Sequence, residues 1–440
     1  MRRSAQLVIS ATVFVDLLGF TLILPALPFY ASELGAGGLW FGALMSAYSV
    51  AQLVAAPVLG RLSDRYGRRP LVLLALAGSA VSMTLTGLAT SLAGLLVCRL
   101  LAGACGGSIS VAQAYLADAV PAERRTGAMA QLGAAIGMAF VVGPALGGLL
   151  APLGFAACAY AAAGLAALNL AAAFAWLPES ARASSATRRP HPLPDHQRAA
   201  PARDHPDGDQ GRDASQRAGL GGSRDGRRPI RPLGVSRPGT APGGPAAGGR
   251  GSRAVALLAG TGFLAMAAFV GMETTLAFLG RDRYGWDATT IGLALAAAGL
   301  AMAAVQAGLV SWLARRWGDA RVAAAGAVTM AGCMVAVSVS ATWWQCMVAV
   351  CLLSAGHGLL TPTVSSLLAA AGPPERRGAR LGTGQSAGAA ARIIGPAGAG
   401  LLFDVGTALP YLAGALSAAL AAAAVLAVPA LEPAGQEEEA

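Results

Sequence analysis

Charged residues are scarce in this chain of 440 residues. They make up 12% of it, against about 25% in soluble domains, and lysine does not occur at all. Hydrophobic residues make up 55%. So few charges beside so much apolar surface exclude an ordinary soluble globular domain, and the composition predicts a protein with many membrane spans. The missing lysine and the excess of Ala, Gly, Arg and Pro indicate base-composition bias rather than chemistry.

Several kinds of site are also missing. There is no phosphate-binding P-loop, so ATP-driven chemistry is not supported and an ion gradient is expected in place of a cofactor. The six cysteines fall in apolar runs without zinc-finger spacing, which favours structural thiols and no metal site. One G-x-S-x-G match, Gly384 to Gly388, lies inside an apolar helical stretch rather than in the strand-turn-helix context of a nucleophile. The chain is therefore not expected to be an enzyme.

Apolar stretches of about 20 residues, the length that crosses a bilayer, occur twelve times. Six precede a polar linker: Gln6 to Phe29, Trp40 to Leu59, Leu71 to Ala89, Leu92 to Tyr115, Gly127 to Leu150 and Phe155 to Leu177. Six follow it: Val255 to Leu279, Thr290 to Leu313, Val322 to Ala341, Trp343 to Ala370, Ala379 to Phe403 and Thr407 to Val428.

The net charge of +10 lies mostly in the linker, because residues 181–253 hold 14 Arg and 6 Asp. This location argues against a nucleic-acid partner. Arginines elsewhere gather in alternate loops, which predicts cytoplasmic termini and a cytoplasmic linker in an inner (plasma) membrane. Arg281 and Arg283, accompanied by Asp282 and Asp287, are the exception. The expected domains are a six-helix half at 1–180, a disordered basic linker at 181–253, a second half at 254–430 and an acidic cytoplasmic tail at 431–440.

The linker allows two interpretations. A basic loop that touches anionic headgroups is favoured. Its length and composition leave a frameshifted stretch open.

The two halves repeat each other. Glu123 and Gly143 have counterparts at Glu375 and Gly395, at a constant offset of 252 residues. Repeated halves around a central site are one way in which transporters build alternating access.

The stretch between the second and third spans holds five charges and two glycines between two long apolar runs, and it predicts a tight cytoplasmic turn. It reads Gly60-Arg61-Leu62-Ser63-Asp64-Arg65-Tyr66-Gly67-Arg68-Arg69-Pro70. The pattern G-x-L-x-D-R-x-G-R-R resembles the signature loop of the major facilitator superfamily. The resemblance implies a fold of twelve helices around a central cavity, with Gly60, Asp64, Arg65, Gly67, Arg68 and Arg69 in gating. It also implies that Asp118, at the end of the fourth span, pairs with Arg68.

Two charged residues inside the first half are expensive in lipid and are therefore candidates for proton coupling. Asp16 stands midway along the first span, in a stretch that resembles the first-span motif of tetracycline-efflux-type drug/proton antiporters. A desolvated carboxylate there can gain and lose a proton as the cavity changes sides. Arg99 resembles the buried arginine of the family's fourth span, and Asp16 is its expected partner. A structural hydrogen bond or a fixed ion pair is the alternative.

Span five ends in Gly143-Pro144-Ala145-Leu146-Gly147-Gly148, which resembles the antiporter motif of this superfamily. Ala139 stands where that motif has a further glycine. Gly143 and Gly147 allow another helix to approach closely, and Pro144 kinks the span. Packing alone is the alternative explanation.

In the second half Glu273, His357 and Arg392 are the ionisable candidates. Glu273 is a further candidate for proton coupling or for binding a cationic drug, unless it lies near the outer surface. His357 titrates in a useful range, although a lone histidine is more often a packing residue. The expected cavity residues are Gln131, Met138, His357, Gln385 and Arg392.

These features predict a monomeric secondary transporter that exports drug-like amphipathic molecules in exchange for protons. Its partners would be the small-molecule substrate, protons and the lipid bilayer. An exporter of an endogenous metabolite or sugar is the runner-up. A membrane scaffold or regulator with a transporter fold and no flux is the alternative from another class.

Overall fold

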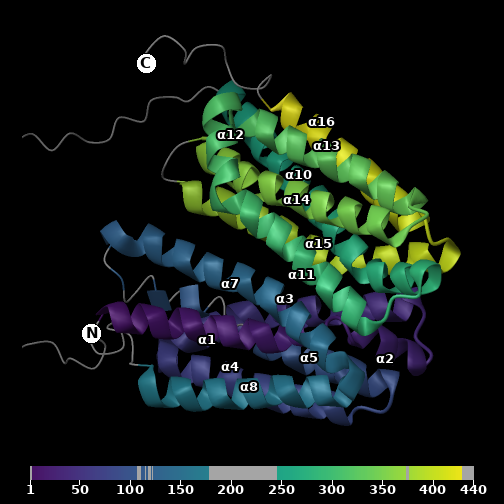
Figure 1. Cartoon of the computed structure of the whole chain (residues 1–440). Helices are drawn as coiled ribbons and strands as arrows, with labels where there is room; N and C mark the ends of the chain where they lie inside the picture. The colour runs from purple at the N-terminus through teal and green to yellow at the C-terminus, as the bar shows by residue number, and fades with distance from the viewer. Residues whose placement is uncertain are drawn as a thin grey trace, which may run out of the picture.

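The computed structural model describes residues 2–106, 111–113, 115–116, 120, 122–177, 245–372 and 376–428, and every regular element in these ranges is a helix (Figure 1). The elements before the linker are α1 (Arg2–Leu22), α2 (Leu27–Glu33), α3 (Gly38–Tyr66), α4 (Arg68–Leu88), α5 (Leu92–Cys105), α7 (Ala122–Leu150), the short 3-10 helix η1 (Ala151–Leu153) and α8 (Phe155–Trp176). Those after it are α10 (Pro245–Tyr284), α11 (Ala288–Ala304), the π-helical turn η3 (Val305–Leu309), α12 (Val310–Trp317), α13 (Asp319–Val339), α14 (Trp343–Ala370), α15 (Arg377–Val405) and α16 (Leu409–Ala427).

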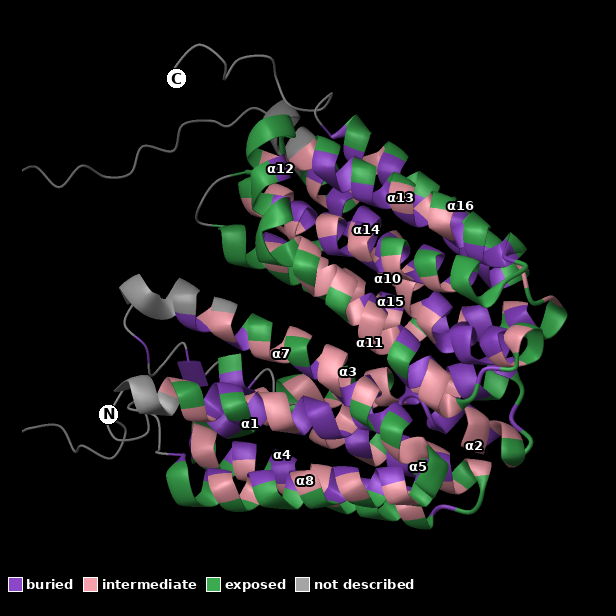
Figure 2. Cartoon of the chain, in the orientation of Figure 1, coloured by how far each residue is buried: buried purple, intermediate pink, exposed green. Residues whose placement is uncertain are grey.

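Eleven stretches of the described residues are long and apolar enough to cross a membrane. The shorter apolar helix α5 lies in the fourth expected span, part of which falls outside the described residues. Many large apolar residues are exposed, among them Leu168 at 69% and Trp176 at 71% on α8. Figure 2 marks the outward-facing side of α8 as exposed. Such a surface suits lipid and would aggregate in water. The predicted all-helical membrane architecture is therefore confirmed.

The structure adds one detail to the expected helix pattern and corrects another. The first span is not one continuous helix, because α1 ends at Leu22 and α2 begins at Leu27. Pro25 lies in the break, where its missing N–H removes a helical hydrogen bond. The expected turn from Gly60 to Pro70 is also mostly helix. Only Gly67 interrupts α3 and α4, with a φ of 99° that favours glycine.

The repeat seen in the sequence recurs in the backbone. Gly318, with a φ of 81°, separates α12 from α13 as Gly67 separates α3 from α4. Contacts within the first half join α1 with α7 and α4 with α8, and contacts within the second join α10 with α15 and α13 with α16. Between the halves, α3 packs on α15 and α7 packs on α11.

The two halves meet at one end of the molecule. We call the end at which α3 passes into α4 the signature-loop end, and the end that holds α2 the opposite end. Figure 1 shows the halves converging near α2 and diverging toward α12. A Cβ on Gly42 would collide with Pro396 O, and one on Gly292 would lie 2.5 Å from Pro144 O, so backbones of the two halves touch toward the opposite end.

The same helices are apart at the signature-loop end. A Cβ placed on Gly133 or Gly137 of α7, on Gly308 of η3, or on Gly382 of α15 would meet no described atom within 4 Å. Among the described residues, the two halves are therefore in contact at the opposite end, which we call closed, and apart at the signature-loop end, which we call open.

Candidate functional site

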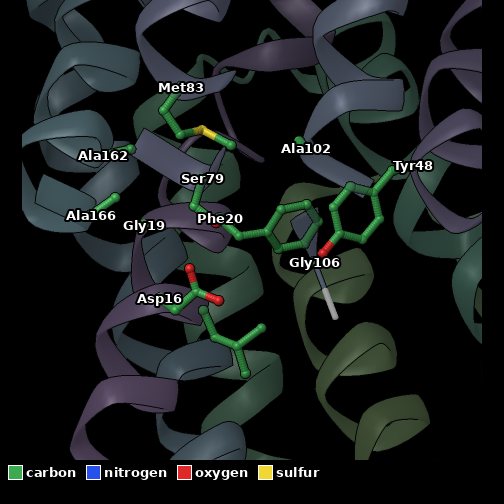
Figure 3. A pocket seen from close by; sticks show the side chains of 11 residues that line it. Asp16, Gly19, Phe20, Tyr48, Ser79, Met83, Ala102, Gly106, Ala162 and Ala166 are labelled. Carbon is green, nitrogen blue, oxygen red and sulfur yellow. The ribbon is translucent and has the colours of Figure 1, made fainter. Parts of the chain in front are cut away.

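Asp16 lines a small cavity in the first half, where α1, α3, α4, α5 and α8 approach one another (Figure 3). We call this the first cavity; its wall includes Phe20, Tyr48, Ser79 and Met83. Its volume of about 20 Å³ is enough for a water molecule but not for a drug. The Asp16 residue is only 9% exposed.

Arg99 of α5 is buried beside this cavity, at 2% exposure. None of its guanidinium nitrogens hydrogen-bonds to a described residue. Its Cζ lies 5.8 Å from the centre of the Phe20 ring, and that ring stacks on Tyr48 at 4.4 Å. The expected hydrogen-bonded pair of Asp16 and Arg99 is therefore absent among the described residues. Cation–π contact with Phe20 replaces it in this conformation.

A second cavity, of about 100 Å³, lies between α10, α14 and α15. It brings together three of the five expected cavity residues, His357, Gln385 and Arg392. The His357 ring stacks on Phe269 at 4.3 Å, and its Nε2 lies 3.3 Å from Thr361 Oγ1. His357 thus has both a packing contact and a polar one, and the sequence had left its role open.

The other two expected cavity residues, and the proton-coupling candidate Glu273, lie elsewhere. Gln131 accepts a hydrogen bond of 2.6 Å from Gln6 Nε2, which ties α7 to α1. Met138 on α7 is 52% exposed. Glu273 is half-buried on α10, lines neither cavity, and forms no hydrogen bond or ion pair with a described residue. The structure does not bring these residues together with Asp16 or Arg392.

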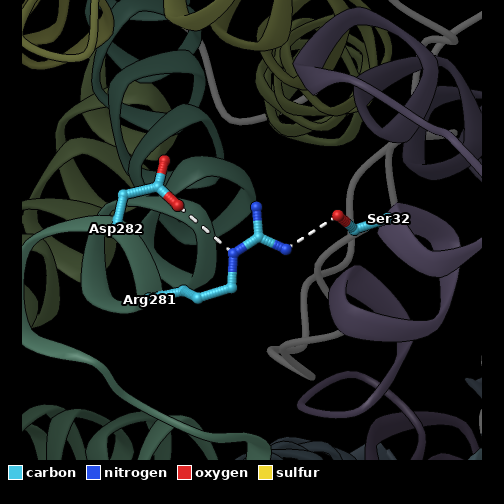
Figure 4. A network of polar contacts seen from close by, with 3 residues as sticks. All are labelled: Ser32, Arg281 and Asp282. Atoms are coloured by element: carbon cyan, nitrogen blue, oxygen red, sulfur yellow. Dashed lines mark hydrogen bonds and ion pairs between the residues drawn. The ribbon is translucent and has the colours of Figure 1, made fainter.

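Polar contacts across the halves hold the opposite end shut. Asp404 of α15 accepts hydrogen bonds of 2.7 and 2.8 Å from the backbone N–H groups of Gly38 and Leu39, at the start of α3. Arg281 Nη1 donates to Ser32 Oγ at 2.7 Å and also pairs with Asp282, as Figure 4 shows. These contacts also explain why a charge cluster stands after the seventh span.

The sequence profile of the Major Facilitator Superfamily matches residues 9–318 and 258–440. This chain belongs to that superfamily. It is a multi-pass membrane transporter rather than an enzyme, and the G-x-S-x-G match lies within helix α15.

Superfamily members with similar sequences include two named for tetracycline resistance. The class C protein of Escherichia coli is 28% identical over 396 residues, which cover 89% of this chain and 88% of the relative. The class G protein of Vibrio anguillarum is 29% identical over 407 residues, or 91% of each chain.

Solved structures show the same fold. The human organic anion transporter MFSD10 (TETRAN) has a TM-score of 0.62 and 25% identity, covering 96% of this chain and 99% of that one. A POT family transporter in complex with 5-aminolevulinic acid has a TM-score of 0.72 at 13% identity, covering 97% of this chain and 96% of that one, and so supports the fold alone.

The superfamily motif at the end of α7 packs on two partners. A Cβ on Gly143 would collide with Thr21 Oγ1, and one on Gly147 with Leu22 O, so these glycines let α1 approach. A Cβ on Gly148 would lie 2.9 Å from Thr289 O of the other half, and the Pro144 carbonyl faces Gly292. The motif therefore joins packing within one half to closure between the halves.

The superfamily's signature stretch lies at the open end. Arg68 hydrogen-bonds to Ser63 Oγ, and Arg69 Nη2 donates to Phe174 O at 2.6 Å. Asp118, the expected partner of Arg68, lies outside the described residues. Gly60 belongs to α3 and has no described neighbour within 4 Å of an added Cβ, while Asp64 and Arg65 lie in the last turns of the same helix.

Two residues of these sites, Tyr48 and Asp404, were not predicted from the sequence. Tyr48 lines the first cavity and stacks on the Phe20 ring, which in turn lies against Arg99. A phenol in the middle of a span was a usable signal, because a buried tyrosine hydroxyl normally needs a partner. Asp404 gave a weaker signal, since an acid at a span's end suits the membrane surface.

Proposed function

We propose that the chain exports drug-like amphipathic molecules in exchange for protons, by alternating access between the two halves. The observation that carries this proposal is Asp16, a nearly buried carboxylate on a cavity of water size, beside the guanidinium of Arg99, which hydrogen-bonds to no described residue. The relatives named for tetracycline resistance support the direction and the substrate class.

The residues around Asp16 suggest how its protonation could change the conformation of the protein. When Asp16 is ionised, its negative charge offsets the positive charge of Arg99 across the rings of Phe20 and Tyr48. Protonation removes that compensation and leaves Arg99 as an uncompensated charge at low dielectric, which is costly. A movement that brings Arg99 to water or to a new partner relieves this cost. Proton uptake would thereby favour one of the two conformations.

The orientation is part of the proposal. Arginines at 65, 68, 69, 315, 316, 376 and 377 lie at the signature-loop end, and positive loops remain in the cytoplasm. We place that end, both termini and the linker on the cytoplasmic side of an inner or plasma membrane. The open state described above then faces the cytoplasm, ready to load a substrate. We also propose that the chain functions as a monomer of two six-helix halves.

The test is proton release from acidified inside-out vesicles when hydrophobic drugs such as tetracycline are added. The wild type is expected to release protons, and Asp16→Asn to show no more release than vesicles without the protein. Asp319→Asn is the matched control, because Asp319 begins α13 and lines neither cavity. It is expected to behave as the wild type.

Three results would change the proposal. Release that survives Asp16→Asn would move coupling to Glu273 or elsewhere. Sugar- or metabolite-driven release without a drug response would favour the runner-up substrate class. No release with any compound, despite confirmed insertion, would favour a scaffold without flux.

A further inference from the structure

Arg392 of α15 carries a charge that no described residue neutralises. Its guanidinium cannot lose its proton at any physiological pH and offers five N–H donors. It forms no hydrogen bond or ion pair with a described residue, although it is half-buried within the wall of the second cavity. A charge withdrawn from water without a partner is costly, so this arrangement favours a ligand that completes it.

The rest of the wall indicates the chemistry of that ligand. The described lining contains no carboxylate, so the cavity has a net positive charge. Polar groups come from His357, Thr361, Ser365 and Gln385, and the remaining wall is apolar or glycine, with Met266 and Leu360 as examples. An anionic group attached to an apolar body matches both parts of this wall.

The cavity is reachable from the open end. Its residues lie in the parts of α10, α14 and α15 nearer the signature-loop end, with 258–266, 357–368 and 381–392 supplying the wall. Gly378, about one helical turn before this wall, and Gly382, within its α15 stretch, have no described neighbour within 4 Å of an added Cβ. A ligand can therefore enter without passing the closed opposite end.

We propose that the second cavity binds the acidic group of an amphipathic organic anion, with Arg392 as its charged anchor and Gln385 beside it. This inference rests on the proposed transport function and narrows its substrates to molecules that carry a carboxylate or a similar group. A volume of about 100 Å³ accepts such a group but not a whole drug, so the apolar body lies in the space between the halves.

The experiment measures equilibrium binding of 1-naphthylacetate and of its uncharged amide to the full chain in detergent, without an ion gradient. The wild type is expected to prefer the carboxylate. Arg392→Gln is expected to raise the Kd of the carboxylate about tenfold or more, since a charge-assisted bidentate pair is lost, and to leave the amide nearly unchanged. Arg392→Lys keeps the charge without the fork and is expected to retain part of the preference.

Arg377→Gln is the matched control, because Arg377 is exposed on the same helix outside the cavity. It is expected to bind both probes as the wild type does. Inorganic phosphate is the other source of negative charge, and it is expected to compete no better than chloride at equal ionic strength.

Equal weakening of carboxylate and amide by Arg392→Gln would overturn the inference, as would a wild type without the preference. Effective competition by phosphate would replace the organic anion with an inorganic one and overturn it too. The binding assay is separate from proton antiport. A carboxylate preference without drug-driven proton release would contradict the proposed antiport alone, and release without the preference would contradict the anchor alone.

Discussion

Asp404 shows how much one side chain contributes to closure. Its two carboxylate oxygens accept the N–H groups of Gly38 and Leu39, which a helix start would otherwise leave unpaired. The helix dipole adds to this attraction for a negative charge. Because donor and acceptor belong to different halves, a helix cap here acts as a latch between them.

We expect Asp404→Ala to loosen the opposite end. A cap contributes about 1 kcal/mol, so amide hydrogen exchange in the first turns of α3 should rise about fivefold. Hydrogen exchange followed by mass spectrometry measures this. Asp287→Ala is the control, because the Asp287 carboxylate caps α11 within its own half through Thr290. That variant should free the start of α11 and leave α3 unchanged, and equal exchange in α3 would contradict the latch.

For single residues, the sequence indicated which charged side chains are candidates for function, but it did not indicate which residues they contact. Asp16, Arg99 and Arg392 stand out because charges are rare in apolar spans. The direct pair of Asp16 and Arg99 was a wrong prediction. The ring of Phe20, from the same helix as Asp16, lies against the guanidinium instead. Such a choice depends on the conformation of the halves, which local sequence does not encode.

Helix α15 combines both kinds of end in one element. A Cβ on its Gly400 would collide with the Gly38 carbonyl of α3, whereas one on its Gly382 would meet nothing described. The same substitution can therefore be placed at a closed and at an open position of a single helix.

We expect Gly400→Ala to destabilise this conformation by about 1–3 kcal/mol, the cost of overpacking, and to lower the thermal midpoint in detergent. Gly382→Ala should be neutral or stabilising by up to about 1 kcal/mol, because alanine favours helix. Differential scanning fluorimetry compares the two. If the two variants melted together below the wild type, the ends of α15 would not differ as described.

At the element scale, hydropathy located the spans because each needs an apolar stretch of fixed length. It could not show that α3 continues to Tyr66, since exposed arginines do not stop a helix outside the lipid. Nor could it show the break before α2, because Leu22 to Leu27 is apolar on both sides of Pro25. The interruption at Gly67 depends on a positive φ, which glycine permits and does not require.

The whole molecule is a pair of halves that touch at one end. Alternating access requires this end to open when the other closes, so a covalent link across it should stop transport but not binding from the open side. Ser32 and Arg281 offer the place for such a link, because their side chains meet across the halves.

In a chain whose six native cysteines have been replaced, we expect a flexible bis-methanethiosulfonate cross-linker, which attaches to each thiol through a reducible disulfide, to abolish transport by the double variant Ser32→Cys, Arg281→Cys. Reduction should restore it. Each single variant treated with the same reagent is the control and should retain transport. Full transport by the cross-linked double variant would show that the opposite end need not open.

The sequence predicted the two halves and their repeat, because an offset of 252 residues preserves Gly143 and Gly395 together with their flanking charges. Which end is closed was beyond it. Both conformations use the same helices with the same apolar faces, and they differ in contacts such as that of Gly42 with the Pro396 carbonyl. The position of α16, the twelfth expected span, does not depend on which end is closed, because α16 packs on helices of its own half.

The glycine contacts at the opposite end have a consequence for adaptation. Closure there uses backbone contacts at positions such as Gly42 and Gly400, where a side chain would collide, together with the side chains of Asp404 and Arg281. None of these residues lines either cavity. Residues of the cavity walls can therefore be exchanged one at a time without altering the contacts that close this end. The residues that line the cavities are thus distinct from the residues that close the opposite end.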